Sequence, residues 1–419
     1  SIMMISSLYN MADTYFVSFL GTSATAAVGV SFPLMAIIQA VGFFFGHGTG
    51  NFISRALGAK RRDDAEQMAA TGFFSSFIGG SVITVLGLVF LAPLARVLGS
   101  TDTILPFAIE YLRFILLGAP FLVSSFMLNN LLRYQGGAFF AMIGMVSGAV
   151  LNLALDPLFI FVFHLGVTGA SLATMISQAL SCVLLFAVGC RRGGNVRISP
   201  RNFAPSADKY KEMVRGGIPS LLRQIVASFA TVLLNHVAGG YGDAVIAAMT
   251  INNRVFLMAG AVVIGFGQSF QPVCGFNYGA KRYDRVKAAF RFCNRLSFIL
   301  LLAVSVLCFI LAPEIVALFR ADDPDVIAVG AFALRAQCFS FPLSGWIMLV
   351  SFMLQTIGKP VSASVLASAR QGLFLIPLLL ILVPACGVLG IQISIPIADC
   401  CTFLISLPFG IMALRRDLA

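Results

Sequence analysis

Long apolar runs alternate with short polar segments along the whole chain. Most of these runs reach or exceed the roughly 20 residues that an α-helix needs to cross a bilayer. Lipid offers the backbone no hydrogen-bond partners, so spanning segments must form helices or a closed barrel, and these unbroken runs lack the alternation of barrel strands. We therefore predict an all-α membrane protein with about 12 transmembrane helices. The expected spans are residues 1–20, 29–54, 67–94, 104–131, 139–163, 166–190, 209–238, 243–274, 286–311, 326–356, 359–383 and 387–414.

Composition agrees with this pattern. Of the 419 residues, 59% are hydrophobic and 11% are charged, with a mean hydropathy of +0.94, whereas soluble domains carry about 25% charged residues. The nine cysteines are scattered and form no CxxC motif, so we expect them to act as small buried hydrophobic residues. Because the chain opens with Ser1 inside an apolar run, we also expect that an N-terminal tail and part of the first helix are missing.

Basic residues account for the net charge of +11, and they gather in alternate loops. Clusters lie at 55–66, 191–215 and 281–295, whereas the intervening loops hold only Arg96 and Arg320 beside several aspartates. Lys and Arg in short loops stay on the cytoplasmic side of a membrane. We therefore expect a multi-pass protein of a prokaryotic cytoplasmic (inner) membrane with both termini in the cytoplasm. The basic loops would contact anionic lipid headgroups, and we expect no nucleic-acid partner.

The chain repeats itself at a shift of 221 residues. Gly-Ala-Lys-Arg at 58–61 returns at 279–282, and at the same shift Gly21 falls on Gly242. Two equivalent turns in register indicate two similar halves of about six helices each. An even number of spans gives both halves the same orientation, so they are predicted to be parallel repeats about an axis along the membrane normal.

The predicted domain boundaries follow the longest hydrophilic stretch. We expect an N-terminal six-helix lobe at 1–190, a cytoplasmic linker at 191–208 and a C-terminal six-helix lobe at 209–419. Two bundles around a central cleft suit alternating access. A pore would more naturally be built by several identical chains, so we expect a monomeric transporter.

Several ionisable and amide residues lie inside the predicted spans. A charge near the bilayer centre costs at least about 2.5–3.5 kcal/mol on insertion scales, so each one needs a physical reason. Asp13 lies in the first span, and Asn152 and Asp156 share one face of the fifth. Thr174 and Gln178 have the same spacing in the sixth span. These carboxylate, amide and hydroxyl oxygens form a hard-oxygen set suited to Na⁺ or to a shared proton.

Structural explanations remain open for some of these residues. Asn152, Thr174 and Gln178 could simply join helices by hydrogen bonds. In the C-terminal half, we expect Arg370 and Asp399 to pair between the last two helices. Pro157 directly follows Asp156 and is expected to disturb the helical hydrogen bonds there.

The sequence lacks the motifs of nucleotide- or metal-dependent chemistry. It has no Gly-x-x-x-x-Gly-Lys-Ser/Thr motif, no HExxH motif and no His/Cys cluster. We therefore predict no enzyme activity, no cofactor and no metal centre other than a coupling Na⁺. Uphill transport would draw on an ion gradient, since one charge crossing 100 mV supplies about 2.3 kcal/mol.

The ordered motifs of the chain resemble those of the multidrug and toxic compound extrusion (MATE) transporters. The matching segments cover essentially the whole chain and are Asp13-Thr14 with Gly21, Gly48-Thr49-Gly50 leading to Leu57-Gly58-Ala59-Lys60, Asn152-x-x-x-Asp156-Pro157, the turn Gly166-Val167-x-Gly169-Ala170, and Arg370-Gln371 before Ile376-Pro377. The resemblance implies two six-helix bundles and export of cationic or amphipathic small molecules by antiport with H⁺ or Na⁺.

The same resemblance implies a coupling site in the N-terminal half. It would consist of Asp13, Asn152, Asp156 and Thr174, with Gln178, Arg370 and Asp399 as auxiliary polar residues. Some branches of the family also use acidic residues in the seventh, eighth or tenth helix. Here those spans contain no carboxylate, so the resemblance does not extend to a second cation site in the C-terminal half.

Two other functions remain as alternatives. A flippase for lipid-linked oligosaccharides can use a similar bilobed fold, and its pyrophosphate would need basic residues such as Arg223, Arg254 and Arg370. A membrane scaffold without transport activity would have no need for carboxylates at mid-membrane. Loss of dye export on substitution of Asp13 would distinguish the exporter from both.

Overall fold

The computed structural model describes residues 15–190, 196–319 and 323–418. Eleven helices in these ranges are long and apolar enough to cross a membrane. They match the second to twelfth predicted spans within a few residues at each end. The first predicted span, 1–20, lies mostly outside the described residues, of which 15–18 are helical.

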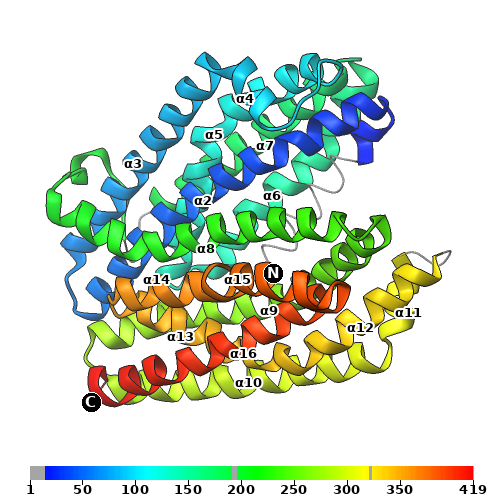
Figure 1. Cartoon of the computed structure of the whole chain (residues 1–419). Coiled ribbons are helices and arrows are strands. Elements are labelled where there is room, and N and C mark those ends of the chain that lie inside the picture. Colours follow the sequence, from blue (N-terminus) through cyan, green and yellow to red (C-terminus); the bar gives the residue numbers. More distant parts are fainter. Residues whose placement is uncertain (1–14, 191–195, 320–322, 419) are drawn as a thin grey trace. The chain divides into compact units, whose positions relative to one another are not determined.

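The chain divides into two compact units, unit 1 up to Leu221 and unit 2 from Leu222. Their helices follow one another with short connections (Figure 1). Those of unit 1 are α2 (Thr22–Gly58), α3 (Arg62–Val89), α4 (Leu91–Val97), α5 (Leu105–Tyr134), α6 (Ala138–Pro157), the π-helix η1 (Leu158–Val162), α7 (Gly166–Cys190), the 3₁₀ turn η2 (Pro200–Asn202) and the first part of α8 (Ala207–Gly239).

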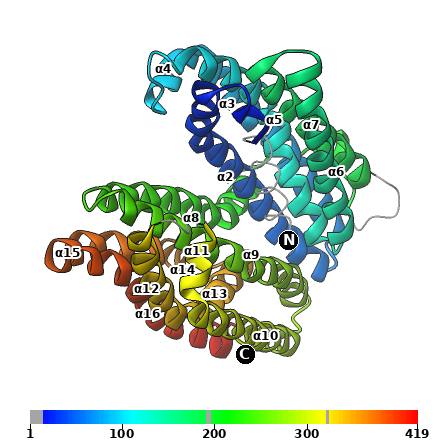
Figure 2. The ribbon, with the colours of Figure 1, turned by 90° about the vertical axis from the view of Figure 1, so that its right-hand side faces the viewer.

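Helix α5 forms the centre of unit 1. It packs against α2, α3, α6 and α7 (Figure 2), and it is the most deeply buried of the candidate spans. Close approach depends on small residues: a Cβ on Gly80 of α3 would lie 2.5 Å from the Cα of Pro120 in α5. Apolar side chains on the outer faces, such as Val85 and Val89 of α3, are exposed, as expected of side chains that face lipid.

Unit 2 has the same order of elements with more interruptions. It contains the rest of α8, α9 (Asp243–Gly279), α10 (Tyr283–Ile310), α11 (Ala312–Phe319), α12 (Pro324–Ser340), the 3₁₀ turn η3 (Phe341–Leu343), α13 (Ser344–Thr356), α14 (Pro360–Ser368), the π-helix η4 (Ala369–Leu375), α15 (Ile376–Cys386), α16 (Val388–Met412) and the π-helix η5 (Ala413–Asp417). Two of its spans are therefore broken, α12–η3–α13 and α14–η4–α15.

The backbone repeats as the sequence predicts. Helices α2 and α9 have 37 residues each, α3 and α10 have 28 each, and α7 and α16 have 25 each. Lys60 and Lys281, in the repeated tetrapeptide, both adopt the left-handed conformation, with φ of 60° and 57°. Gly21 and Gly242, which precede α2 and α9, have φ of 114° and 106°. The two halves therefore share turn geometry as well as helix lengths.

The division between the units differs from the predicted linker at 191–208. Val196 and Ile198 are buried in the hydrophobic core of unit 1, so this segment is packed where it is described. The first turns of α8 also belong to unit 1, where a Cβ on Gly48 of α2 would lie 2.2 Å from the Met213 carbonyl oxygen. The boundary therefore falls inside α8.

Candidate cation-coupling site

A polar cluster joins α6 and α7 in the interior of unit 1. The Asn152 side-chain amide donates to Asp156 Oδ1 at 3.2 Å and to Thr174 Oγ1 at 3.3 Å. Asn152, Asp156 and Thr174 are only 1%, 0% and 2% exposed. The structure thus brings together three of the four predicted coupling residues. The fourth, Asp13, lies outside the described residues.

The local sequence explains why α6 ends at this cluster. Asn152 and Asp156 are one turn apart, so both side chains lie on the same face of the helix. Pro157 has no N–H to donate to the preceding turn, and the π-helix η1 begins directly after it. The predicted disturbance next to Asp156 is therefore confirmed. π-Turns within helices frequently accompany functional sites.

Small residues let α6 and α7 approach closely below the cluster. A Cβ on Gly148 would lie 3.0 Å from Ser181 Cβ and 3.1 Å from the Ser177 carbonyl oxygen. The Ser181 hydroxyl donates to the Gly144 carbonyl at 2.9 Å. Gly144 and Gly148 thus form the small-residue spacing that favours tight helix packing in membranes.

A small cavity of about 40 Å³ lies beside the cluster. It is lined by Gly148 and Asn152 of α6, by Thr174, Ser177 and Gln178 of α7, and by apolar side chains of α5 and α6. A water molecule needs roughly 10–15 Å³ by this measure, so the cavity has room for about three. Gln178, predicted as an auxiliary residue, therefore shares a cavity with Asn152 and Thr174.

Several polar atoms in this cavity lack protein partners. Within the described part of the chain, Asn152 Oδ1, Ser177 Oγ and Gln178 Nε2 have no hydrogen-bond partner. Leaving a buried polar atom unpaired costs about 1–3 kcal/mol, which favours a bound guest. Two of the three atoms can present oxygen lone pairs, and Asp156 supplies negative charge one turn away. The donor set suits a small hard cation or a proton.

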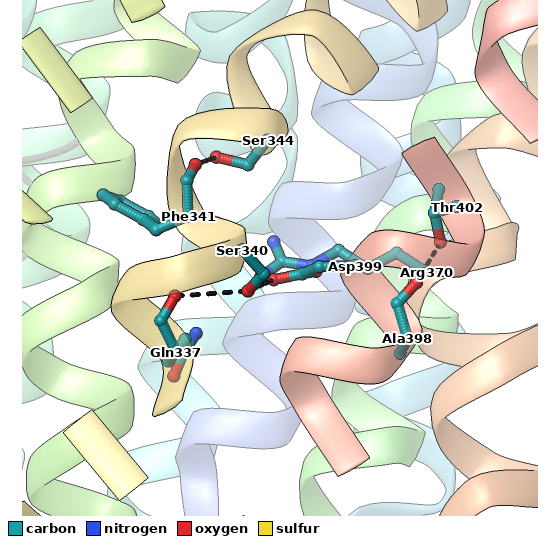
Figure 3. Close-up of polar contacts among 8 residues, drawn as sticks. All are labelled: Gln337, Ser340, Phe341, Ser344, Arg370, Ala398, Asp399 and Thr402. Atoms are coloured by element: carbon teal, nitrogen blue, oxygen red, sulfur yellow. Dashed lines mark hydrogen bonds and ion pairs between the residues drawn. The ribbon is translucent and has the colours of Figure 1, made fainter. Parts of the chain in front are cut away.

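Unit 2 contains a different polar cluster, centred on Asp399 of α16 (Figure 3). Arg370, in η4, donates from Nε to Asp399 Oδ1 at 2.5 Å and from Nη2 to Oδ2 at 3.4 Å. Ser340 donates to Asp399 Oδ2 at 3.1 Å. Asp399 and Ser340 are fully buried, and the Arg370 side chain is 34% exposed. The predicted pairing of Arg370 with Asp399 is confirmed.

The family model named MatE matches the chain twice, at residues 2–158 and 219–381. Together these matches cover well over half of the chain and include Asn152 and Asp156. The chain belongs to the MatE family. Its two matches correspond to the two repeated halves, so family membership and internal repeat agree. A MatE protein is a transporter, and this chain is therefore a multi-pass membrane transporter and not an enzyme.

Individual relatives match almost the whole MatE chain. The multidrug export protein MepA of Staphylococcus haemolyticus is 28% identical over 420 residues, which cover 99% of this chain and 91% of that protein. MepA of Staphylococcus aureus (strain MSSA476) is 29% identical over 400 residues, which cover 94% and 87%.

Solved structures of MATE proteins resemble the fold closely. One, described as MATE in the bent conformation, has 31% identity and a TM-score of 0.94, with 100% of this chain and 94% of that chain covered. Another, described as MATE in the straight conformation, has 31% identity and a TM-score of 0.92 over the same shares. The expected all-α fold of the family is confirmed.

Two residues of these clusters were missed in the sequence of this MatE chain. Ser177 lies three residues after Thr174, so helical spacing alone could have placed it on the same face. Ser340 contacts Asp399 across 59 residues of sequence, and no local signal indicates that contact. Serine is common in apolar helices, where it bonds its own backbone, and a functional serine does not stand out.

Proposed function

We propose that this transporter is a secondary active multidrug exporter that exchanges cationic or amphipathic small molecules for H⁺ or Na⁺. The observation that carries the proposal is the fully buried Asp156 beside a polar cavity in unit 1. A carboxylate in the interior of a membrane bundle persists only if it is paired, protonated or bound to a cation. The names of the staphylococcal relatives support the export of drugs.

The size of the cavity supports an ion rather than a drug as its guest. Pockets for drug-sized ligands measure about 300–1,000 Å³, and this cavity has about 40 Å³. Asn152, Asp156 and Thr174 would hold the coupling cation or proton, with Asp13 as the fourth group that the family resemblance implies. Gln178 and Ser177 would complete the polar wall.

Coupling follows if the ion and the drug favour different conformations. An ion at Asp156 changes the equilibrium between two arrangements of unit 1 only if it binds one arrangement more tightly. Drug binding must then change ion affinity by the same factor. A monomer with both termini in the cytoplasm, placed in a bacterial cytoplasmic membrane by its basic loops, would export the drug as the ion enters.

The direct test is transport by the purified chain in proteoliposomes. A cationic dye would be loaded inside, and an imposed pH gradient and an imposed Na⁺ gradient would be applied separately. We expect one of the two gradients to drive dye across the membrane against its concentration. Dye movement that ignores both gradients would contradict ion-coupled antiport.

A further inference from the structure

The repeat allows positions of unit 1 and unit 2 to be matched one by one. Helices α7 and α16 have 25 residues each and begin at Gly166 and Val388, so equivalent positions lie 222 residues apart. Asp399 therefore corresponds to Ser177. Helices α6 and α14 begin at Ala138 and Pro360, again 222 residues apart. Arg370, ten residues beyond Pro360, corresponds to Gly148.

The third member of the unit 2 cluster follows the same rule. Helix α5 ends at Tyr134 and the α12–α13 span ends at Thr356, so Ser340 corresponds to Gly118. In unit 1 these positions also lie together. A Cβ on Gly148 would be 3.1 Å from the Ser177 carbonyl, and a Cβ on Gly118 would be 3.1 Å from Gln178 Oε1.

The two halves therefore fill equivalent space in different ways. In unit 1, Gly148 and Ser177 line the cavity beside the candidate cation site. In unit 2, the equivalent positions hold the Arg370 guanidinium and the Asp399 carboxylate in contact. The unit 1 oxygen set is also replaced, because Asn152, Asp156 and Thr174 correspond to Phe374, Leu378 and Pro396.

We propose that Arg370 is a covalently attached cation on a second carboxylate site. Unit 2 would thereby hold permanently the compensated state that unit 1 reaches only when a proton or cation binds. Only unit 1 would then respond to the ion gradient. The meaning of this asymmetry for coupling rests on the proposed function, whereas the occupancy of the Asp399 site by Arg370 does not.

The geometry explains why this attached cation would not exchange. Both carboxylate oxygens of Asp399 accept from Arg370, and Oδ2 also accepts from Ser340. Planar, two-point contact of this kind is the strongest form of guanidinium–carboxylate pairing. Because the cation is attached to η4, its effective concentration at the carboxylate does not depend on the ions in solution.

It follows that removing the Arg370 side chain should create an exchangeable cation site. Arg370→Ala leaves a buried carboxylate with Ser340 as its remaining partner and a void of guanidinium size. Free guanidinium would fit that void, and Na⁺ or another small monovalent cation would satisfy the charge. Breaking one side of a buried pair is strongly destabilising, so we expect the apparent melting temperature to fall by roughly 5–15 °C.

The test uses the full chain purified in detergent, without any gradient. Guanidinium, Na⁺ and choline, as chlorides, would be titrated in the millimolar range while the melting temperature and tryptophan fluorescence are recorded. The chain has a single tryptophan, Trp346 of α13, and a Cβ on Gly410 of α16 would lie 2.8 Å from its ring. Its fluorescence therefore reports on the helix that carries Asp399.

Three further variants serve as controls. Arg370→Lys keeps an attached cation, and Arg370→Ala combined with Asp399→Asn removes both charges. Arg335→Ala removes another arginine of unit 2, whose Nε donates to the Phe309 carbonyl at 3.2 Å and not to a carboxylate.

We expect Arg370→Ala alone to show a saturable response, with guanidinium restoring most of the lost stability and choline restoring none. Equal behaviour of Arg370→Ala and the double variant in guanidinium and Na⁺ would overturn the proposal. If Arg370→Ala is recovered folded only in buffers with guanidinium or Na⁺, the proposal is supported; equal recovery in choline contradicts it. Because no transport is measured, failure of ion-coupled efflux leaves this result independent.

Discussion

Asn152 donates to the Asp156 carboxylate at 3.2 Å from one turn earlier on the same face of α6. The same amide nitrogen lies 3.3 Å from Thr174 Oγ1 on α7. Asn152 therefore links the buried charge on one helix to a hydroxyl on the next, and its own Oδ1 borders the cavity without a partner among the described residues. A change in the charge of Asp156 would be felt at the contact between the two helices.

The first prediction concerns the Thr174 hydroxyl. Thr174→Val keeps the shape of the side chain and removes an oxygen from the cavity wall. A hydrogen bond of this kind contributes about 1 kcal/mol, so we expect the ion concentration for half-maximal efflux to rise roughly five-fold. The control is Thr402→Val, since Thr402 is equally buried but donates to the Ala398 carbonyl of its own helix. Equal effects of the two substitutions would show that Thr174 acts only through packing.

The second prediction concerns packing in unit 1. Gly80→Ala would place a Cβ 2.5 Å from the Cα of Pro120, and a backbone cannot yield as a flexible side chain can. We expect a loss of about 1–3 kcal/mol, as for other overpacked interiors. Gly29→Ala is the matched control, because its Cβ would meet nothing within 4 Å and alanine favours a helix by up to about 1 kcal/mol. Thermal unfolding in detergent should rank Gly29→Ala at or above the native chain and Gly80→Ala below it.

The third prediction concerns orientation. In a background without the nine native cysteines, Asp323→Cys should react with a membrane-impermeant thiol reagent added to intact cells. Lys60→Cys should react only after the membrane is opened, because the basic loops are expected in the cytoplasm. The reverse pattern would invert the predicted topology and the direction of export.

The fourth prediction separates the two polar clusters. Asp399→Asn should lower transport modestly, because it leaves the Arg370 guanidinium without its anionic partner in unit 2. The dependence of the remaining transport on the ion gradient should stay as in the native chain. Loss of that dependence, with drug binding intact, would move the coupling site into unit 2.

Much of the fold could be predicted because the bilayer imposes it. Apolar length gave the spans, and the repeated Gly-Ala-Lys-Arg gave two halves whose Lys60 and Lys281 share left-handed geometry. The unit boundary inside α8 was not predictable, because hydrophilicity marks 191–208 while buried Val196 and Ile198 hold that segment on unit 1. Loop composition does not reveal such contacts.

The candidate site was predictable in part for a similar reason. Helical spacing placed Asn152 beside Asp156, but the register of α6 against α7 is set by contacts such as Gly148 with Ser181. The breaks at η3 and η4 were also not predicted. Pro342 and the π-turn at Arg370 act through packing against α16, which no local pattern in the chain specifies.

The central claim is that Asp156 binds the ion whose gradient drives export. The most direct measurement is dye efflux from proteoliposomes by the native chain, by Asp156→Asn and by Asp13→Asn, with drug affinity measured on the same preparations. We expect each variant to insert and to bind the dye, while gradient-driven efflux falls to background and dye affinity no longer changes with pH or Na⁺. Efflux at the native rate with unchanged ion dependence in Asp156→Asn would contradict the account.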